Sequence, residues 1–380
     1  MADQSIPQDD ETTVAACHAE WLSQSIGLLG NQDSRELAHH TTFGIGGPAA
    51  ELVRATTTSE IVDAVRDADE SGMPLMVLSG GSNVLIADEG FDGRVVLVDN
   101  HGLDAEVSSC GGALVRAAAG ERWDDFVAHT IDCEWAGIEA LSGIPGLVGA
   151  TPVQNVGAYG QEVAQTIARV RTWDRKAGEY RTFTADQCGF SYRDSIFKRS
   201  RAQSEPTGRY VVVEVWFQFV NASRSMPIGY SQLAAHLGAG IGDRVDAREV
   251  REAVLELRRS KGMVHDPTDP DTRSAGSFFT NPIVPAGVAD ALPSEAPRFP
   301  IGDGRVKSSA AWLIDHAGFG KGFPGAGAAR LSSKHVLALT NHDHASAAQV
   351  AKLARTVHDG VKNRFGVELV PEPVIVGLTI

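Results

Sequence analysis

One neutral, glycine-rich stretch is the strongest candidate for ligand chemistry. It runs from Ser142 to Gly160, SGIPGLVGATPVQNVGAYG, and holds five glycines and two prolines but no charged side chain. Glycines this dense disfavour a regular helix or strand, because each loses backbone entropy on folding and packs no side chain. They do offer bare backbone N–H groups that can lie against a bulky anion. The stretch predicts an amide-lined pyrophosphate site that is buried or covered by ligand; a glycine-rich surface loop is the alternative.

A second glycine turn, Ser79-Gly80-Gly81-Ser82-Asn83, follows a strand predicted at residues 74–78. Its N–H and hydroxyl donors stand at a strand end, which makes it a nucleotide-loop candidate in its own right. The turn does not match the G-x-G-x-x-G dinucleotide fingerprint, and no G-x-x-x-x-G-K-[ST] P-loop occurs in the chain. Rossmann and P-loop folds are therefore disfavoured.

Composition and charge limit the classes of partner. The chain has 380 residues, enough for two or three domains, and a formal net charge of -14. That charge argues against nucleic acid or an anionic membrane as a partner. No apolar run approaches the ~20 residues of a membrane span, and the acidic N-terminus is unlike a signal peptide. We expect a soluble cytoplasmic monomer that acts on small molecules.

Cysteine and histidine spacing predicts no metal site. The four cysteines are far apart and form no C-x-x-C pair, which is typical of reduced thiols. They are Cys17, Cys110, Cys133 and Cys188. His342 and His344 are two residues apart, which is not the helical ligand spacing of a zinc site.

The elements that must position the two glycine turns can be read from the first half of the chain. Residues 1–35 are polar and predicted to be a mobile arm. Thr57 and Glu60 have capping-box spacing ahead of an apolar face, and Gly72 ends that helix. Strands are expected at 94–98, 114–119 and 209–219, a helix at 122–132, and a hairpin at 168–174 and 179–184.

The character of the chain changes after about Met226. A helix begins at Asp246 and ends at Gly262. Residues 285–305, with four prolines, predict a long loop. Beyond it we expect a short helix at 308–317, a strand at 335–341, a long helix at 345–365 and a last strand at 368–376.

Several uncommon motifs follow one another between residues 40 and 377. They are TTFGIGGPA, SGGSNVL, the stretch from Ser142 to Gly160, FSYRDSIFK, GYSQL, AGSFFTNP, AAWLID and a terminal PEP. In this order they resemble the UDP-N-acetylenolpyruvoylglucosamine reductase family of bacterial cell-wall synthesis. The resemblance implies an α+β fold with an FAD-binding module of the vanillyl-alcohol-oxidase/PCMH type at 36–225, in two subdomains at about 36–100 and 101–225. A substrate-binding α+β domain at 226–366 and a terminal strand at 367–380 would follow.

The same resemblance implies an NADPH-dependent reduction of UDP-N-acetylglucosamine enolpyruvate to UDP-N-acetylmuramate through noncovalently bound FAD. Both glycine turns supply the implied FAD contacts. These residues are Ser79, Gly80, Gly81, Ser82, Asn83, Val84, Ile144, Pro145, Gly146, Gly149, Ala150, Thr151, Gln154, Asn155, Gly157, Ala158 and Gly160.

Three residues match the family's catalytic positions. Hydride addition to the β-carbon of an enol ether needs a cation at the neighbouring carboxylate and a proton source over the α-carbon. Arg193 of FSYRDSIFK matches the catalytic arginine, which can bind that carboxylate through two hydrogen bonds. Ser277 of AGSFFTNP matches the proton donor, and Glu372 of the terminal PEP matches a glutamate that assists at the same end. Glu368, which lies nearby, is the alternative to Glu372.

Four further positions resemble substrate-binding residues. Tyr230 of GYSQL resembles a tyrosine that closes over the substrate diphosphate, and Lys261 resembles a basic residue near the same phosphates. Tyr192 and Asn281 resemble lining residues. Alternatively, Tyr230 is an ordinary surface tyrosine and Lys261 complements the end of its helix.

Two other functions stay open at this level. A flavin oxidase of the same architecture would couple its product to oxygen uptake and would have no use for Ser277. A flavin-binding or UDP-sugar-binding protein without catalysis would tolerate Ser277→Ala.

Overall fold

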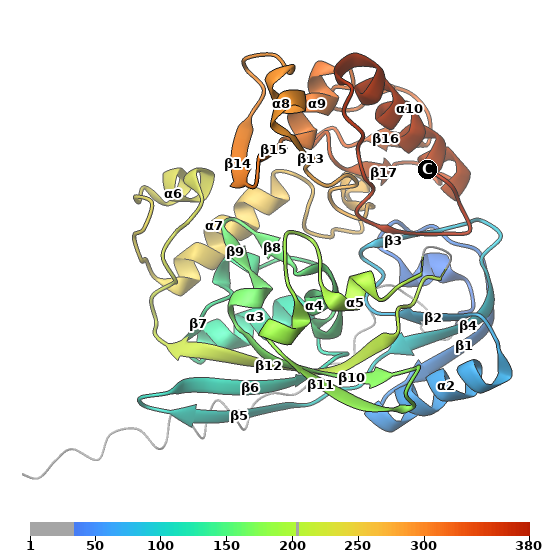
Figure 1. Cartoon of the computed structure of the whole chain (residues 1–380), viewed down its shortest axis with the longest axis vertical. Helices are drawn as coiled ribbons and strands as arrows, with labels where there is room; N and C mark the ends of the chain where they lie inside the picture. Colours follow the sequence, from blue (N-terminus) through green and yellow to red (C-terminus); the bar gives the residue numbers. More distant parts are fainter. Residues whose placement is uncertain (1–33, 203–204) are drawn as a thin grey trace, which may run out of the picture.

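The computed structural model describes residues 34–202 and 205–380. The arm predicted over residues 1–35 therefore falls, apart from its last two residues, outside the described part of the chain. Figure 1 shows two sheets along the base and, above them, the part of the chain after residue 230, coloured yellow to red. The short elements of the glycine-rich stretch, α4 (Thr151–Gln154), β8 (Gly157–Ala158) and β9 (Gln161–Glu162), lie between these layers.

The first sheet is parallel and carries the glycine turn at residues 79–83. Its order is β1 (Ala49–Ala55), β4 (Phe91–Val98) and β2 (Leu75–Leu78), and α2 (Thr58–Ser71) packs its apolar face on it. The predicted cap is confirmed, because Thr57 Oγ1 accepts the Glu60 amide at 3.1 Å. The end of β2 leads directly into the turn that begins at Ser79.

The second sheet is antiparallel and contains the predicted hairpin. Its order is β11 (Glu179–Thr184), β10 (Ile167–Asp174), β12 (Tyr210–Asn221), β6 (Gly112–Ala118) and β5 (Leu103–Ser108), and β7 (Trp135–Ala136) also pairs with β12. α3 (Trp123–Asp132) buries Trp123 and Phe126 against this sheet. β5 was not predicted, and its alternate residues Leu103, Ala105 and Val107 are only half-buried against the core.

The glycine-rich stretch forms only short pieces of regular structure, as predicted. A 3-10 turn, η3 (Val148–Ala150), leads into α4, and the β8–β9 hairpin follows. Most of the stretch is buried or half-buried, while Gly160 is exposed. The α5 helix (Ile196–Arg199) packs beside α4. The predicted buried, irregular stretch is therefore confirmed.

The C-terminal half forms a separate layer of helices and short strands. Its elements are α6 (Ser231–Leu237), α7 (Ala247–Arg259), β13 (Ile283–Pro285), α8 (Ala286–Asp290), β14 (Arg298–Gly302), β15 (Arg305–Ser308), α9 (Ala310–His316), β16 (Ala329–Leu331), β17 (Leu339–Asn341) and α10 (Ala347–Phe365). The predicted loop at 285–305 is wrong, since α8 and the sheet β13-β15-β14 occupy this region. Pro285 is the N-cap of α8 and Pro300 lies in the edge strand β14, two places where a missing N–H is tolerated, while Pro293 and Pro297 lie between these elements.

The chain end returns to the glycine turn at residues 79–83. β18 (Val374–Val376) pairs in parallel with β3 (Val84–Ile86), and the Val374 amide donates to the Asn83 carbonyl at 3.0 Å. The predicted strand at 368–376 is therefore shorter than expected, as is the one predicted at 335–341. Glu372 precedes β18 rather than lying in it, because the neighbouring prolines interrupt the pairing.

Candidate active site

Two adjoining cavities, of about 200 and 190 Å³, form the candidate site. They share Ser82, Asn83, Ala150 and Gln154, so one extended ligand could occupy both. None of the described residues that line the first cavity carries a formal charge. The second cavity brings together all three predicted catalytic residues.

The first cavity lies at the end of β2, against the glycine turn. Its walls are the turn at 79–84, the end of η3, α4, Phe197 and the start of β12. The Ser79 hydroxyl is buried and has no hydrogen-bond partner within the described residues. A buried hydroxyl left unsatisfied costs about 1–3 kcal/mol, so this atom fits a polar ligand group such as a phosphate or ribose of FAD.

Two of the glycines are required by close packing. A Cβ on Gly81, whose φ is +58°, would lie 1.8 Å from the His40 carbonyl oxygen. A Cβ on Gly149 would lie 2.5 Å from the Ala119 Cβ. Only glycine lets these backbones approach so closely, and both turns are held beside the cavity as a result.

The second cavity is organised around an arginine–glutamate pair. Arg193 Nε lies 3.0 Å from Glu372 Oε1, and its Nη2 donates to the Gly157 carbonyl at 2.7 Å. Arg193 has a left-handed φ of +54°, which turns the chain inside the FSYRDSIFK motif. Lys198 Nζ holds this turn by donating to the Arg193 carbonyl at 2.9 Å and to Gln154 Oε1 at 3.1 Å.

Burial and neighbouring cations shift the pKa of Glu372 in opposite directions. Its side chain is 16% exposed, and burial raises the pKa of its carboxyl, while Arg193 and Lys198 act in the opposite direction. Glu372 N donates to the Phe278 carbonyl at 2.8 Å, which holds the glutamate beside the Ser277 segment. Glu368 is exposed and faces His358 and Lys362, away from Arg193. Of the two glutamates, only Glu372 therefore meets Arg193.

Ser277 lies on the opposite segment of the same cavity. It is half-buried, follows Gly276 at a φ of +70°, and has no hydrogen bond from its hydroxyl to any described residue. Its hydroxyl is therefore free to donate into the cavity.

Two basic residues that sequence reasoning missed complete this cavity. Arg258 donates from Nη2 to the Met263 carbonyl at 2.7 Å, while its buried Nε has no partner within the described chain. Burial lowers the pKa of Arg258, against the attraction of Tyr159 and Asp124. His265 Nδ1 is likewise buried without a partner among the described residues, and burial lowers the pKa of that ring. The signal available in the sequence was the basic end of the helix predicted at 246–262 and the turn after it. Basic residues at a helix end are equally well explained by helix capping, so this signal did not identify a site.

The predicted substrate residues form two groups. Tyr192 accepts the Asn281 amide through its hydroxyl at 3.4 Å, and Lys307 Nζ lies 4.8 Å from the Tyr192 ring centroid. In the second group, the Tyr230 ring meets Tyr159 edge to face at 5.6 Å. Lys261 Nζ lies 5.4 Å from the Tyr159 ring centroid. None of these four predicted residues lines either cavity, although Lys261 directly precedes Gly262, which lines the second cavity.

Most predicted cofactor residues line one of the two cavities, and three do not. Asn155 is buried and donates its amide to Glu162 Oε2 and the Ser191 carbonyl, so it braces the protein itself. Ala158 lies in the β8–β9 hairpin, and Gly160 packs against Gly229. These three were predicted as cofactor contacts because they share the glycine-rich stretch, and in the structure they line neither cavity.

No three His, Cys, Asp or Glu side chains in the described part of the chain are grouped to hold a metal ion. No helix within residues 34–202 and 205–380 has the length and apolar character needed to cross a membrane.

Known proteins resemble this chain over nearly its whole length. A family model described as "UDP-N-acetylenolpyruvoylglucosamine reductase, C-terminal domain" matches residues 266–376, and one described as "FAD binding domain" matches residues 49–184. The chain is 57% identical to the UDP-N-acetylenolpyruvoylglucosamine reductase of Cutibacterium acnes over 98% of each chain. It is 52% identical to that of Thermobifida fusca, over 90% of this chain and 97% of the other.

The chain belongs to the UDP-N-acetylenolpyruvoylglucosamine reductase family. The crystal structure of the Thermus caldophilus reductase is similar, with a TM-score of 0.59 and 25% identity over 90% of this chain and 97% of that one. The predicted family and the α+β fold with an FAD-binding module are therefore confirmed, and FAD is the cofactor.

Proposed function

We propose that this chain reduces UDP-N-acetylglucosamine enolpyruvate, with Arg193, Ser277 and Glu372 acting at the reacting atoms. As a member of its family, the chain is an FAD-dependent oxidoreductase of peptidoglycan precursor synthesis, with NADPH as reductant and UDP-N-acetylmuramate as product. The observation that carries the residue roles is the convergence of three distant segments on one cavity beside the uncharged one.

FAD, when bound, supplies the hydride chemistry. We assign its binding to the turn at 79–84 and to the residues of the glycine-rich stretch that line the cavities. The unpartnered Ser79 hydroxyl and the close-packed Gly81 and Gly149 support this assignment. Backbone N–H groups can donate hydrogen bonds to phosphate oxygens, so this cavity needs no buried cationic side chain.

Arg193 is assigned to the carboxylate of the enolpyruvyl group. Its guanidinium can donate two parallel hydrogen bonds and stabilise negative charge that develops toward that carboxylate as the β-carbon is reduced. The contact with Glu372 and the bond to Gly157 orient its fork, while Lys198 holds its backbone.

Ser277 is assigned as the proton donor to the α-carbon. A serine hydroxyl is a weak acid, but a carbon that carries developing negative charge is a strong enough base to take its proton. Glu372, whose pKa is raised by burial, assists at the same end by orienting Arg193 and by supporting proton delivery.

We assign the outer groups to the rest of the substrate. Tyr230 and Lys261, with Tyr159, offer a cation and aromatic edges suited to a diphosphate. Tyr192 and Asn281, which are bonded to each other but line neither cavity, are assigned to the substrate on motif resemblance alone. We further propose the division into FAD-binding residues 36–225, a substrate domain at 226–366 and a terminal segment at 367–380. We place the enzyme in the cytoplasm, because its widely separated cysteines are typical of reduced thiols, and we take it to be a monomer, because the sequence contains no coiled-coil pattern.

The test is NADPH consumption by FAD-loaded protein under anaerobic conditions, with and without UDP-N-acetylglucosamine enolpyruvate. Consumption that requires the sugar nucleotide and yields equimolar UDP-N-acetylmuramate is expected. Flavin reduction with the substrate left intact would contradict the proposed function. In a parallel aerobic sample, product formation tied to oxygen uptake would point instead to a flavin oxidase.

A further inference from the structure

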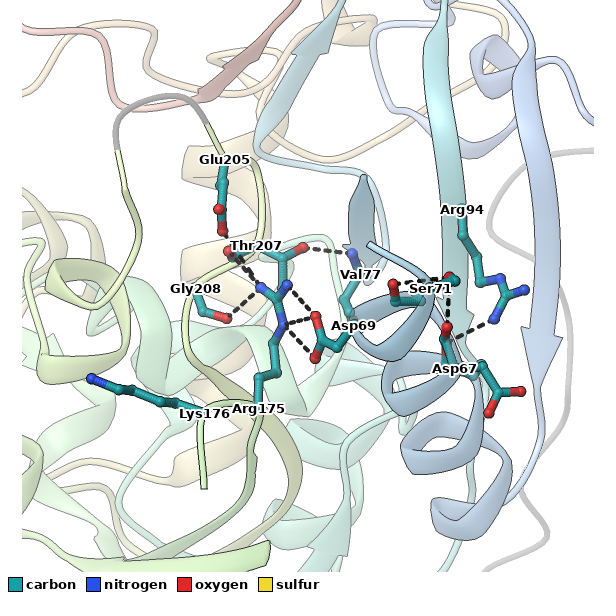
Figure 2. A network of polar contacts seen from close by, with 12 residues as sticks. Asp67, Asp69, Ser71, Val77, Arg94, Arg175, Lys176, Glu205, Thr207 and Gly208 are labelled. Carbon is teal, nitrogen blue, oxygen red and sulfur yellow. Dashed lines mark hydrogen bonds and ion pairs between the residues drawn. The ribbon is translucent and has the colours of Figure 1, made fainter. Parts of the chain in front are cut away.

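A polar network that includes none of the three proposed catalytic residues holds one wall of the first, uncharged cavity in place. Pro206, Thr207 and Gly208 line that cavity, just before β12 begins. Figure 2 shows that the Arg175 guanidinium lies between this segment and α2, with bonds to both. Arg175 itself lies beyond the cavity, in the turn between β10 and β11.

Arg175 uses its whole fork. Its Nε and Nη2 donate to the Asp69 carboxylate of α2, with the shortest contact at 2.6 Å. Its Nη1 donates to the carbonyls of Thr207 at 3.2 Å and Gly208 at 3.3 Å. The Arg175 and Asp69 side chains are only 17% and 25% exposed, so water screens this pair less than a surface ion pair. Arg175 Nη1 also lies 3.7 Å from Oε2 of the exposed Glu205. A planar guanidinium can meet the Asp69 carboxylate and both carbonyls at once, and a lysine cannot.

The held segment is in turn bonded to the strand that delivers the glycine turn. Thr207 Oγ1 accepts the Val77 amide at 2.7 Å, as Figure 2 shows. Val77 lies in β2, two residues ahead of Ser79, and it also lines the cavity. Arg175 therefore fixes, through Thr207, the spacing between two walls of the same cavity.

We propose that Arg175, anchored by Asp69, is a positioning residue for FAD binding. It holds the segment at 206–208 against β2, so that the cavity has its binding shape before the cofactor enters. A preorganised site loses less free energy on ordering when the ligand binds, and this raises affinity without any new ligand contact. The proposal rests on the assignment of FAD to the uncharged cavity.

The experiment measures FAD affinity directly. Apo-protein is titrated with FAD, and quenching of FAD fluorescence gives Kd, with NADPH and sugar nucleotide absent. Arg175→Met is expected to raise Kd by at least about tenfold, mainly through faster release of FAD. Turnover at saturating FAD is expected to match that of the wild type, because Arg175 contacts neither cavity.

Asp69→Asn tests the same Arg175–Asp69 contact by changing the carboxylate instead of the guanidinium. The substitution keeps the side-chain shape, so it also serves if Arg175→Met does not fold. The double variant should raise Kd by less than the product of the two single effects, because both act through one contact. If the two substitutions instead raised Kd independently, so that their effects multiplied, the proposal that Arg175 and Asp69 act through one contact would be contradicted.

Arg66→Met is the matched control. Arg66 lies on the same helix and pairs with Asp63 at 2.6 Å, but both side chains are about half exposed. Its Kd for FAD should stay at the wild-type value. The FAD-induced rise in Tm, which follows Kd through mass action, should shrink for Arg175→Met and not for Arg66→Met.

An unchanged Kd for Arg175→Met, with or without a lower apo-protein Tm, overturns the proposal and leaves Arg175 as a stabilising residue only. Because the titration contains no substrate, this result is independent of whether the proposed reductase reaction and residue roles hold. Tight FAD binding by a variant whose turnover has fallen would likewise contradict the assignment.

Discussion

The two cavities that meet at Asn83 and Gln154 differ in what lines them. The first is walled by apolar side chains, hydroxyls and bare backbone, with no charged residue among its described lining. The second gathers Arg193, Arg258 and Glu372 in a space of similar volume. Taking charges out of water is costly unless they are paired, so buried charge is expected where a reaction develops charge.

This difference separates binding from chemistry along one cleft. The uncharged cavity suits a cofactor that stays in place, because amides and hydroxyls can hold it without competing buried ions. The charged cavity suits a step in which an enol ether gains negative charge, since preformed cations are then most effective. Substitutions of Arg193, Ser277 and Glu372 in the charged cavity should therefore change turnover, and those in the uncharged cavity should change cofactor affinity.

Ser277→Ala should have the largest effect and sharpens the comparison most. Loss of a positioned general acid is expected to slow turnover by about 10²- to 10⁴-fold. Flavin reduction by NADPH should continue at the wild-type rate, because that half-reaction needs no proton from Ser277. Anaerobic stopped-flow measurement of flavin absorbance separates the two half-reactions. Equal slowing of both would remove Ser277 from its assigned role.

Arg193→Lys should have the next largest effect. Lysine keeps the charge but not the fork, so kcat/KM should fall by about 10²- to 10³-fold, again mainly after flavin reduction. Arg199→Lys is the matched control, since Arg199 lies on the same segment, is about half exposed and pairs with Asp194. Steady-state kinetics on both variants give the comparison. A similar loss in both would indicate a general disturbance of the loop.

The parts of this site that follow from local chemistry were predictable from the sequence. The Thr57 cap, the end of α2 at Gly72 and the buried, irregular stretch from Ser142 to Gly160 each depend on neighbouring residues, and all are confirmed. Arg193, Ser277 and Glu372 were identified through motif resemblance, because no local pattern brings such distant residues together.

What could not be predicted depends on long-range pairing. The return of β18 to β3 places Glu372 beside Arg193, and no signal in the last strand specifies that partner. The sequence likewise does not reveal that Arg258 Nε is left without a partner or that Lys198 braces Arg193. The prediction of a loop at 285–305 was wrong because its prolines were taken to interrupt regular structure, although an edge strand accepts proline.

Gly149→Ala tests the uncharged cavity. The new Cβ would lie 2.5 Å from the Ala119 Cβ and 3.0 Å from its Cα, so the backbone of η3 must shift. We expect FAD affinity to fall by about tenfold, a difference of about 1.4 kcal/mol, with little change in turnover once FAD is saturating. Fluorescence titration measures the affinity.

Gly287→Ala is the control for that substitution. Gly287 lies in α8, has no left-handed φ, and has no atom within 4 Å of an added Cβ. Alanine there should leave FAD affinity unchanged and stabilise the helix by about 0.5–1 kcal/mol. A fall in turnover at saturating FAD in Gly149→Ala would break the division between the two cavities.

The smallest expected effect is a pH dependence of stability set by Glu372. Burial raises the pKa of this carboxyl above its usual value of 4.5, so the folded protein keeps a proton that the unfolded chain loses as pH rises past about 4.5. The folded state then binds more protons than the unfolded state, and the free energy of unfolding falls with rising pH across that window.

Glu372→Gln removes this pH-dependent contribution, so the free energy of unfolding of the variant minus that of the wild type should increase as pH rises through the window and level off above it. Urea unfolding of apo-protein at a series of pH values measures the difference, with Glu368→Gln, at a 66% exposed side chain, as the matched control. A difference that does not change with pH, or the same slope in both variants, would show that desolvation of Glu372 is not what makes the charged cavity costly to maintain.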